Sequence, residues 1–339
     1  MRQSDMRLLV TGGAGFIGSH LVDLVVNLGG QVVVVDDLSS GRVENLPTHR
    51  SVQFINKSFW KCEARDFTGN FDAVVHLAAL PSVATSWEQP MRAHDSNLSL
   101  TLHAITLASE LRIKRVIFAS SAAVYGKASE VPTKESSQTK PSSPYGLQKL
   151  TSELYGQLFA GPLGPSFVSL RFFNVFGSRQ PPSSPYSGVI SNFLAAMQRN
   201  QSVNITGDGE QTRDFVYVKD VAAALQAAVT KVPNEMRCSA LNIGTGVPTS
   251  VLELRREMIR FFPDADKAPV FLPTPSGDIP HSTACITAAT EVLEFSPRYS
   301  LRDGLAELFQ DSVKPSKASC DSTMNVGRRR KQLTSQKRR

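Results

Sequence analysis

Residues 7–18 read Arg7-Leu8-Leu9-Val10-Thr11-Gly12-Gly13-Ala14-Gly15-Phe16-Ile17-Gly18, and this stretch decides the fold. Its first five residues are typical of a buried strand, and apolar residues after Gly15 recur at helical spacing. Glycines between a strand and a helix permit a tight turn and let backbone N–H groups approach a pyrophosphate at the positive helix end. The spacing fits both G-x-x-G-x-x-G and G-x-G-x-x-G. The stretch therefore predicts a dinucleotide site.

A second buried strand, Val32-Val33-Val34-Val35-Asp36, ends on an acid. Asp36 lies at the distance expected for a carboxylate that binds an adenosine ribose. Such a carboxylate would repel a 2′-phosphate, so Asp36 favours NAD, and the neighbouring Asp37 adds to this preference. The alternative is that Asp36 only begins a turn with Ser39-Ser40-Gly41.

Further apolar runs predict strands at residues 52–55, 73–77, 116–119 and 167–170, with helical patterns between them. This alternation predicts an α/β fold with a doubly wound parallel sheet, whose ligands bind at the carboxyl ends of the strands. A helix at 220–229, a strand at 240–243 and a helix at 250–261 predict that the chain returns to the sheet and then completes a smaller domain. The expected division is 1–175, 176–312 with segments near 215–245 returning to the sheet, and a tail, 313–339.

The residues Ser143-Pro144-Tyr145-Gly146-Leu147-Gln148-Lys149 predict the start of a helix with a reactive pair. Tyr145 and Lys149 lie one turn apart on the same face. A fixed ammonium within roughly 4–6 Å favours the phenolate, so Lys149 and a second cation would bring Tyr145 into the working range of a base. The alternative is a surface tyrosine and a surface lysine on an amphipathic helix.

Two serines follow the predicted strand at 116–119. Ser120 and Ser121 should therefore stand at the carboxyl end of the sheet, where a serine can bind the substrate hydroxyl that Tyr145 deprotonates. Capping of a turn is the alternative role for either serine.

The formal net charge of +7 is concentrated in the tail. Residues 314–339 contain nine Lys or Arg and one Asp, which leaves the rest of the 339-residue chain at −1. A nearly neutral body does not indicate a nucleic-acid groove, so no specific nucleic-acid partner is expected. The polar tail is expected to be disordered, either merely solvated or in contact with an acidic surface.

Cysteines, histidines and hydropathy favour a soluble cytoplasmic protein. Cys62, Cys238, Cys285 and Cys320 lack C-x-x-C spacing, which fits free thiols in a reducing compartment. The scattered histidines predict no metal site. Apolar runs are shorter than the roughly 18–20 residues of a membrane span, and the N-terminus lacks a signal-peptide pattern, so no membrane partner is expected.

Several short motifs occur in order along the chain. They are Thr11-Gly12-x-x-Gly15-x-x-Gly18, Asp36, His76-Leu77-Ala78-Ala79, Ser120-Ser121-x-x-Val124-Tyr125-Gly126, Tyr145-x-x-x-Lys149 and Arg171-x-x-Asn174. Together they resemble the extended short-chain dehydrogenase/reductase superfamily, and within it the NAD-dependent nucleotide-sugar epimerases of the UDP-glucose/UDP-N-acetylglucosamine 4-epimerase type. The resemblance runs from about residue 6 to about residue 310 and implies a Rossmann sheet with a smaller C-terminal substrate-binding domain.

The resemblance implies an isomerase that epimerises C4 of a UDP-hexose through a 4-keto sugar, with transient hydride transfer to NAD⁺. It makes Tyr145 the general base, Lys149 its pKa-lowering partner and a ribose ligand, and Ser121 the hydroxyl-orienting group. The implied NAD-binding residues are Gly12, Gly15, Phe16, Ile17, Gly18, Asp36, Ala78 and Lys149.

The resemblance also implies a substrate site and a homodimer. The implied substrate-binding residues are Asn174, Val189 in the Tyr186-Ser187-Gly188-Val189 loop, Arg213 and Ser282. Arg213 would bind the diphosphate of a UDP-sugar through its two-pronged guanidinium. The small Ser282 predicts room for an N-acetyl group. The dimer would form through the helix that carries Tyr145 and a helix near 97–110.

Two positions depart from the family pattern. Ser58 stands where an acid usually contacts adenine, and Pro275 stands where an arginine usually precedes the Gly277-Asp278 pair. Loss of a diphosphate ligand would lower substrate affinity.

Other functions stay open. A UDP-glucuronate 4-epimerase differs mainly in how the C6 group is bound. A nucleotide-sugar dehydratase would carry an acid pair where this chain has Ala122-Ala123. A non-catalytic NAD-binding sensor module has no need of Ser121, Tyr145 and Lys149.

Overall fold

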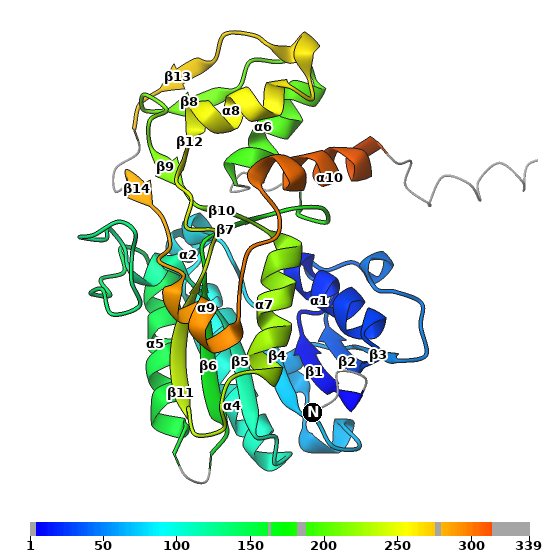
Figure 1. The fold of residues 1–339 in the computed structure, drawn as a ribbon. Coiled ribbons are helices and arrows are strands. Elements are labelled where there is room, and N and C mark those ends of the chain that lie inside the picture. Colours follow the sequence, from blue (N-terminus) through cyan, green and yellow to red (C-terminus); the bar gives the residue numbers. More distant parts are fainter. Residues whose placement is uncertain (1–4, 162–163, 182–187, 275–278, 314–339) are drawn as a thin grey trace, which may run out of the picture.

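The computed structural model describes residues 5–161, 164–181, 188–274 and 279–313, and its centre is a seven-stranded sheet (Figure 1). The strands are β1 (Arg7–Thr11), β2 (Gln31–Asp36), β3 (Val52–Asn56), β4 (Ala73–His76), β5 (Arg115–Ser121), β6 (Ser166–Phe172) and β11 (Cys238–Ile243). Their order is β11-β6-β5-β4-β1-β2-β3, and every neighbouring pair is parallel. Both faces are covered, which explains why the strands are almost continuously apolar.

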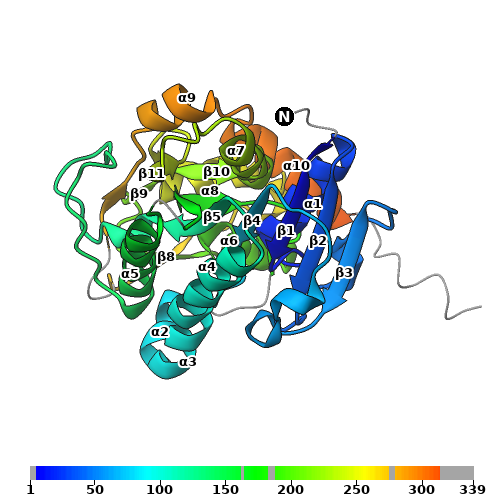
Figure 2. The same ribbon diagram turned by 90° about the horizontal axis from the view of Figure 1, so that it is seen from below.

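Helices cover the two faces of the sheet (Figure 2). On one face lie α1 (Phe16–Asn27), α7 (Val218–Thr230) and α9 (Thr287–Leu293), and on the other lie α4 (Leu100–Glu110) and α5 (Pro144–Phe159). Side chains alternate along a strand, so Leu8 and Val10 belong to the first apolar core and Leu9 to the second. The prediction of an α/β fold with a doubly wound sheet is confirmed.

Shorter elements connect the sheet to a second group of helices, which lies above it in Figure 1. The remaining helices are α2 (Val83–Glu88), α3 (Pro90–His94), α6 (Val189–Gln198), α8 (Val251–Ile259) and α10 (Leu301–Val313). The remaining strands are β7 (Asn174–Phe176), β8 (Asn204–Thr206), β9 (Thr212–Arg213), β10 (Phe215–Tyr217), β12 (Thr249–Ser250), β13 (Val270–Leu272) and β14 (His281–Ser282). Single helical turns are η2 (Val43–Asn45), η3 (Phe59–Lys61), η4 (Ala64–Asp66), η5 (Asp95–Ser99), η6 (Ala122–Val124) and η7 (Pro263–Ala265).

The upper part has a core of its own. Buried side chains from α6, β10, α8 and α10 meet there, among them Phe193, Tyr217, Leu254 and Leu305. After β10 the chain returns through α7 to β11, which pairs with β6 at the edge of the main sheet. The predicted division at residues 175 and 312 stays a prediction. The Tyr186-Ser187 segment, Pro275 and the basic tail lie outside the described residues.

None of the helices in the described parts of the chain is long and apolar enough to span a lipid bilayer.

Candidate active site

The first turn of α5 is held against the end of β5. Ser143 caps the helix, since its Oγ accepts a 3.1 Å hydrogen bond from the backbone N–H of Gly146. A Cβ atom on Gly146 would lie only 2.5 Å from the carbonyl oxygen of Ala123. The missing side chain of Gly146 therefore lets the helix start approach the turn after Ser121 closely.

Ser121 and Tyr145 meet at this junction. Ser121 is the last residue of β5, and its Oγ accepts a 3.2 Å hydrogen bond from the backbone N–H of Ala123. Burial raises the pKa of Tyr145, and a hydrogen bond with the Ser121 side chain opposes that rise. The structure thus brings together the predicted base and the predicted hydroxyl-orienting serine.

Lys149 lies one turn further along α5 and is only 3% exposed. Its Nζ atom donates a 2.8 Å hydrogen bond to the carbonyl oxygen of Ala119 and lies 5.7 Å from the centre of the Tyr145 ring. Burial lowers the pKa of Lys149 to about 7, and the charge of Glu153 opposes that fall.

The expected lowering of the Tyr145 pKa by Lys149 and a second cation stays a prediction. In the chain itself, burial raises the pKa of Tyr145, and the hydrogen bond with Ser121 counteracts that rise.

A buried polar network behind Lys149 escaped the sequence analysis. Glu153 and Arg171 form an ion pair, with 2.7 Å between Arg171 Nη2 and Glu153 Oε2, and both side chains are below 10% exposed. Ser120 donates its hydroxyl hydrogen to Glu153 Oε1, and Arg171 Nη1 donates to the Tyr125 hydroxyl at 2.8 Å. The Glu153 position, four residues after Lys149 on the same helix face, was the available signal.

The burial of α5 is the reverse of an ordinary amphipathic helix. Its buried residues include Gln148, Lys149, Ser152 and Glu153. Leu147, Leu154 and Leu158 are exposed instead, with exposed fractions of 55%, 53% and 79%. The polar side chains of the buried face form hydrogen bonds inside the protein, and the leucines of the opposite face are exposed to solvent.

The glycine turn lies at the carboxyl ends of β1 and β4. Gly12 has a φ of +69°, and a Cβ atom there would lie 2.7 Å from the backbone nitrogen of Ala78. A Cβ atom on Gly18 would lie 2.3 Å from the carbonyl oxygen of Gly12. Thr11 Oγ1 accepts hydrogen bonds from the backbone N–H groups of Leu77 and Ala78, each at 3.2 Å. Bare backbone from two strands is therefore packed together at the start of α1.

The helix start itself suits an anion. Gly15 precedes α1 and has no side chain, so no capping side chain accepts hydrogen bonds from the first N–H groups of the helix. Phe16 and Ile17 form the first turn and are half-buried. Uncapped N–H groups at a positive helix end match the pyrophosphate of a dinucleotide.

Asp36 ends β2 beside this turn and is 8% exposed. Its Oδ2 accepts a 2.9 Å hydrogen bond from the backbone N–H of Ala14, and its Oδ1 accepts one of the same length from Leu38. Burial raises the pKa of Asp36, and these two hydrogen bonds oppose the rise. Each oxygen keeps a free lone pair, so the carboxylate organises its own turn and still fits the hydroxyls of a ribose. These residues fit NAD.

A cavity of about 510 Å³ opens beside Ser121. Three predicted substrate residues line it together with Ser121, namely Asn174 of β7, Arg213 of β9 and Ser282 of β14. Parallel pairing of β14 with β9 places Ser282 opposite Arg213. The predicted Val189 lies elsewhere, at the start of α6, where it packs against the upper core.

Other residues of this cavity were not predicted. Val83 and Trp87, one turn apart on α2, contribute an apolar wall, and Trp87 is 64% exposed. His281 of β14 also lines the cavity, and its Nδ1 lies 3.0 Å from Thr212 Oγ1. The order of elements does not show that α2 faces β14, so these residues required the three-dimensional structure.

Asp214 holds the strand that carries Arg213. Its buried carboxylate accepts hydrogen bonds from the backbone N–H groups of Thr245 at 2.7 Å, Gly246 at 2.9 Å and Ala284 at 3.0 Å. Asp214 therefore joins the segment after β11 and the segment after β14 to the Arg213 side of the cavity.

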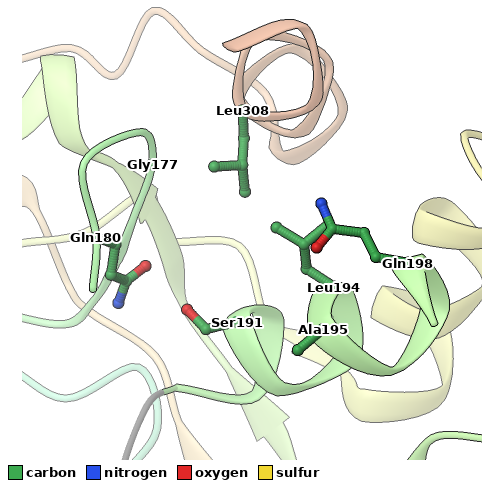
Figure 3. A pocket seen from close by; sticks show the side chains of 7 residues that line it. All are labelled: Gly177, Gln180, Ser191, Leu194, Ala195, Gln198 and Leu308. Atoms are coloured by element: carbon green, nitrogen blue, oxygen red, sulfur yellow. The ribbon is translucent and has the colours of Figure 1, made fainter. Parts of the chain in front are cut away.

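A second cavity, of about 40 Å³, lies in the upper part between α6, α10 and the segment after β7 (Figure 3). Leu194 and Gln198 of α6 line it opposite Leu308 of α10. It contains no predicted site residue and has room for about one or two water molecules.

Comparison with known proteins gives close matches. The model of the NAD dependent epimerase/dehydratase family matches residues 8–244. The UDP-glucose 4-epimerase of Mycolicibacterium smegmatis is 34% identical over 308 residues, which cover 89% of this chain and 97% of that protein.

Two solved structures share the whole architecture. A UDP-glucose 4-epimerase from Thermotoga maritima, solved with UDP-glucose, has a TM-score of 0.84 and 39% identity, with 91% of this chain and 100% of that chain covered. A UDP-N-acetylglucosamine 4-epimerase from Methanobrevibacter ruminantium, solved with UDP-N-acetylmuramic acid, has a TM-score of 0.84 and 36% identity, with 91% and 99% covered.

Proposed function

Because the chain belongs to the NAD dependent epimerase/dehydratase family, we propose that it is an NAD-dependent isomerase that inverts C4 of a UDP-hexose. The proposed substrate pairs are UDP-glucose with UDP-galactose and UDP-N-acetylglucosamine with UDP-N-acetylgalactosamine. The observation that carries this proposal is that one cavity extends from Ser121 to Asn174, Arg213 and Ser282. Relatives named UDP-glucose 4-epimerase and UDP-N-acetylglucosamine 4-epimerase support it.

The reaction needs a group that removes the proton of the sugar 4-hydroxyl and later returns it. Tyr145 is the proposed base, because its hydroxyl is hydrogen-bonded to Ser121, and Ser121 lines the cavity. Ser121 would bind the same sugar hydroxyl and orient it toward Tyr145. Arg213 would bind the diphosphate through charge-assisted hydrogen bonds, and Asn174 would contact the nucleotide sugar.

The glycine turn and its surroundings would hold the cofactor. The proposed ligands are Gly12, Gly15, Phe16, Ile17, Gly18, Asp36, Ala78 and Lys149. When bound, NAD⁺ supplies a reversible hydride acceptor for C4 and a positive charge. The buried position of Lys149 keeps its ammonium out of bulk water, so it would act on a ribose rather than on solvent.

The proposal extends to N-acetylated sugars. Ser282 is a small residue on the cavity wall, and a cavity of about 510 Å³ leaves room for a 4-keto sugar to turn over inside it. UDP-glucuronate is a further substrate to test, since epimerisation of that sugar differs mainly in how the C6 group is bound.

The geometry disfavours a dehydratase. Ala122 and Ala123 form the turn after Ser121 and line the cavity themselves. An acid pair at these two positions would be needed to expel water from the sugar, and two methyl groups occupy the place of that acid pair.

We also propose a homodimer in the cytoplasm. The open apolar face of α5 supports the dimer, because exposed leucines spaced along one helix face mark an interaction surface. Cys62, Cys238 and Cys285 are free thiols in the described part of the chain, and free thiols fit a reducing compartment.

The test is an NMR assay of purified protein with NAD and each of three substrates, UDP-glucose, UDP-N-acetylglucosamine and UDP-glucuronate. We expect C4-epimerised product from at least one UDP-hexose, and a loss of about 10²–10⁴-fold in the Tyr145→Phe variant. No product from any of the three by a protein that still binds NAD would refute the proposal and favour the sensor module.

A further inference from the structure

We infer that Ser86 is a positioning residue for Tyr145, because it fixes the start of α5 to α2, the helix that forms the apolar wall of the cavity. The inference rests on the proposed function, in which Tyr145 is the base. Ser86 is fully buried and, within the described part of the chain, the α2 residues that line the cavity are Val83 and Trp87. Ser86 would therefore act through Tyr145 and not on the substrate.

A hydrogen bond between two helices joins Ser86 to Tyr145. The Ser86 Oγ atom accepts a 3.1 Å hydrogen bond from the backbone N–H of Tyr145, although the two residues are 59 positions apart in the chain. The Ser86 hydroxyl donates its own hydrogen to the carbonyl oxygen of Val83 at 2.6 Å. A hydroxyl has one hydrogen to donate and two lone pairs that accept. The bond to Val83 thus leaves the lone pairs of Ser86 available to the N–H of Tyr145.

The first turn of α5 explains why the N–H of Tyr145 needs a partner from elsewhere. The first N–H groups of a helix find no carbonyl partner inside the helix. Pro144, the first residue of α5, has no N–H group, and the N–H of Gly146 donates to the capping oxygen of Ser143 at 3.1 Å. The N–H of Tyr145 lies between these two residues, and Ser86 of α2 supplies its acceptor. The backbone of the proposed base is therefore held by α2 as well as by its own helix.

A second link joins the same two segments. Asn97 of η5 is 1% exposed, and its Oδ1 accepts a 2.8 Å hydrogen bond from the backbone N–H of Leu80, just before α2. The Nδ2 atom of Asn97 donates to Oε1 of Gln148 at 2.8 Å, one turn after Tyr145 on α5. The segment that leads into α2 and α2 itself are thus fixed to the first two turns of α5 at separate points.

This arrangement relates the wall of the cavity to the position of the base. Val83 and Trp87 line the cavity from the exposed side of α2, whereas Ser86 lies on its buried side. A displacement of about 1 Å between reacting groups can lower a rate about 100-fold. Loss of the bond between Ser86 and Tyr145 should therefore lower kcat, while the cavity wall that binds the substrate stays in place and KM changes little.

The first experiment follows the N–H group of Tyr145 and does not depend on activity. The chain has six tyrosines, so protein labelled with ¹⁵N-tyrosine gives six amide signals, and the signal lost in Tyr145→Phe is that of Tyr145. In the NAD-free protein we expect Ser86→Ala to accelerate hydrogen exchange of this N–H about tenfold relative to that of Tyr155, further along α5, because it loses its acceptor. Unchanged exchange at Tyr145 would overturn the inference.

Ser152→Ala is the matched control. Ser152 is as fully buried as Ser86, but its Oγ donates to the carbonyl oxygen of Gln148 at 2.9 Å within α5 itself. This variant loses a buried hydroxyl without losing a link between helices, so exchange at Tyr145 should stay close to that of the unchanged protein. Ser86→Cys guards against failure to fold, because it keeps a side chain of similar size with a weak acceptor. Its exchange rate at Tyr145 should lie between those of the unchanged protein and Ser86→Ala.

The second experiment measures kinetics in the NAD-loaded enzyme. We expect Ser86→Ala to lower kcat about tenfold with KM for the UDP-sugar changed less than about threefold, and Ser152→Ala to leave kcat almost unchanged. In the Tyr145→Phe background the residual rate should no longer respond to Ser86→Ala, because the hydroxyl that Ser86 positions is absent. A loss of the same size in both backgrounds would contradict a role through Tyr145. If no chain is active, the proposed function fails, and hydrogen exchange still decides whether Ser86 fixes Tyr145.

Discussion

The Nζ atom of Lys149, on α5, donates a 2.8 Å hydrogen bond to the carbonyl oxygen of Ala119, on β5. The same atom lies 4.7 Å from the centre of the Phe118 ring. One backbone oxygen and an aromatic face replace the water that an ammonium normally binds. Burial of Lys149 therefore lowers the stability of the folded chain at every pH where the lysine is charged, a cost that a functional role would account for.

This cost leads to the first prediction, that Lys149→Met stabilises the NAD-free protein and abolishes activity. The pKa of Lys149 falls from 10.5 to about 7 on folding, which corresponds to a cost of up to about 5 kcal/mol where the unfolded chain is protonated. The cost is complete below about pH 7 and fades as the pH rises toward 10.5, because the folded lysine is then neutral. Urea unfolding at pH 6, 8 and 10 should show an advantage of the variant that shrinks with rising pH.

The exposed Lys114 provides the control for this measurement. Lys114→Met should change the unfolding free energy by less than about 0.5 kcal/mol at each pH. A Lys149→Met variant that is no more stable than the unchanged protein at pH 6 would contradict the argument.

The second prediction concerns Ser121. Its hydrogen bond lowers the pKa of Tyr145 against the effect of burial, so Ser121→Ala should raise that pKa. Activity that requires the phenolate should then appear only at higher pH. In a plot of kcat against pH, the acidic limb should therefore move to higher pH. At pH 7 we expect a loss of about 10–100-fold. Ser142→Ala is the matched control, because Ser142 lines the same cavity without this bond, and its profile should not move.

Much of the sheet could be predicted from the sequence because parallel strands buried on both faces are continuous apolar runs. The glycine turn, Asp36 and the start of α5 were also predictable, since each depends on contacts within about one βαβ unit. The short strands β9 and β14 were not predicted, because their pairing joins Thr212 to His281 across the sequence. Neither was the burial of Glu153, since a glutamate on a helix is ordinarily exposed and only the contacts with Ser120 and Arg171 make its burial favourable.

The third prediction tests the glycine turn. A Cβ atom on Gly18 would lie 2.3 Å from the Gly12 carbonyl oxygen and 2.7 Å from Gly13 Cα, and these backbone atoms cannot rotate away as a side chain would. We expect Gly18→Ala to weaken NAD binding more than tenfold in calorimetry and to destabilise the fold by about 1–3 kcal/mol. Gly161→Ala is the control, because its Cβ would meet nothing within 4 Å. Equal NAD affinity in both variants would refute the proposed cofactor site.

The fourth prediction uses the two tryptophans of the chain, Trp60 and Trp87. Trp87 lines the cavity proposed for the substrate. Trp60 lies on η3 and contacts His103, with 5.5 Å between the two ring centres. A UDP-sugar should therefore change the fluorescence of the Trp60→Phe variant and leave that of Trp87→Phe almost unchanged. Trp87→Ala should also raise KM severalfold. If the fluorescence changes only in the Trp87→Phe variant, which keeps Trp60, the substrate binds elsewhere.

The fifth prediction concerns the open face of α5. Leu158 is 79% exposed and lies on the same face as Leu147 and Leu154, so a second copy of the chain could bury all three. We expect the unchanged protein to be a dimer by light scattering at micromolar concentration, and Leu158→Glu to shift it to a monomer, because a carboxylate would have to be buried without a partner.

Phe271 of β13 is the control for this substitution, since it is 53% exposed and lies far from α5 in the fold (Figure 1). Phe271→Glu introduces the same charge at an apolar surface position and should leave the dimer intact. If the unchanged protein is a monomer, the dimer proposal fails. If Phe271→Glu dissociates the dimer and Leu158→Glu does not, the interface lies on the upper part of the molecule and the exposed leucines of α5 require another explanation.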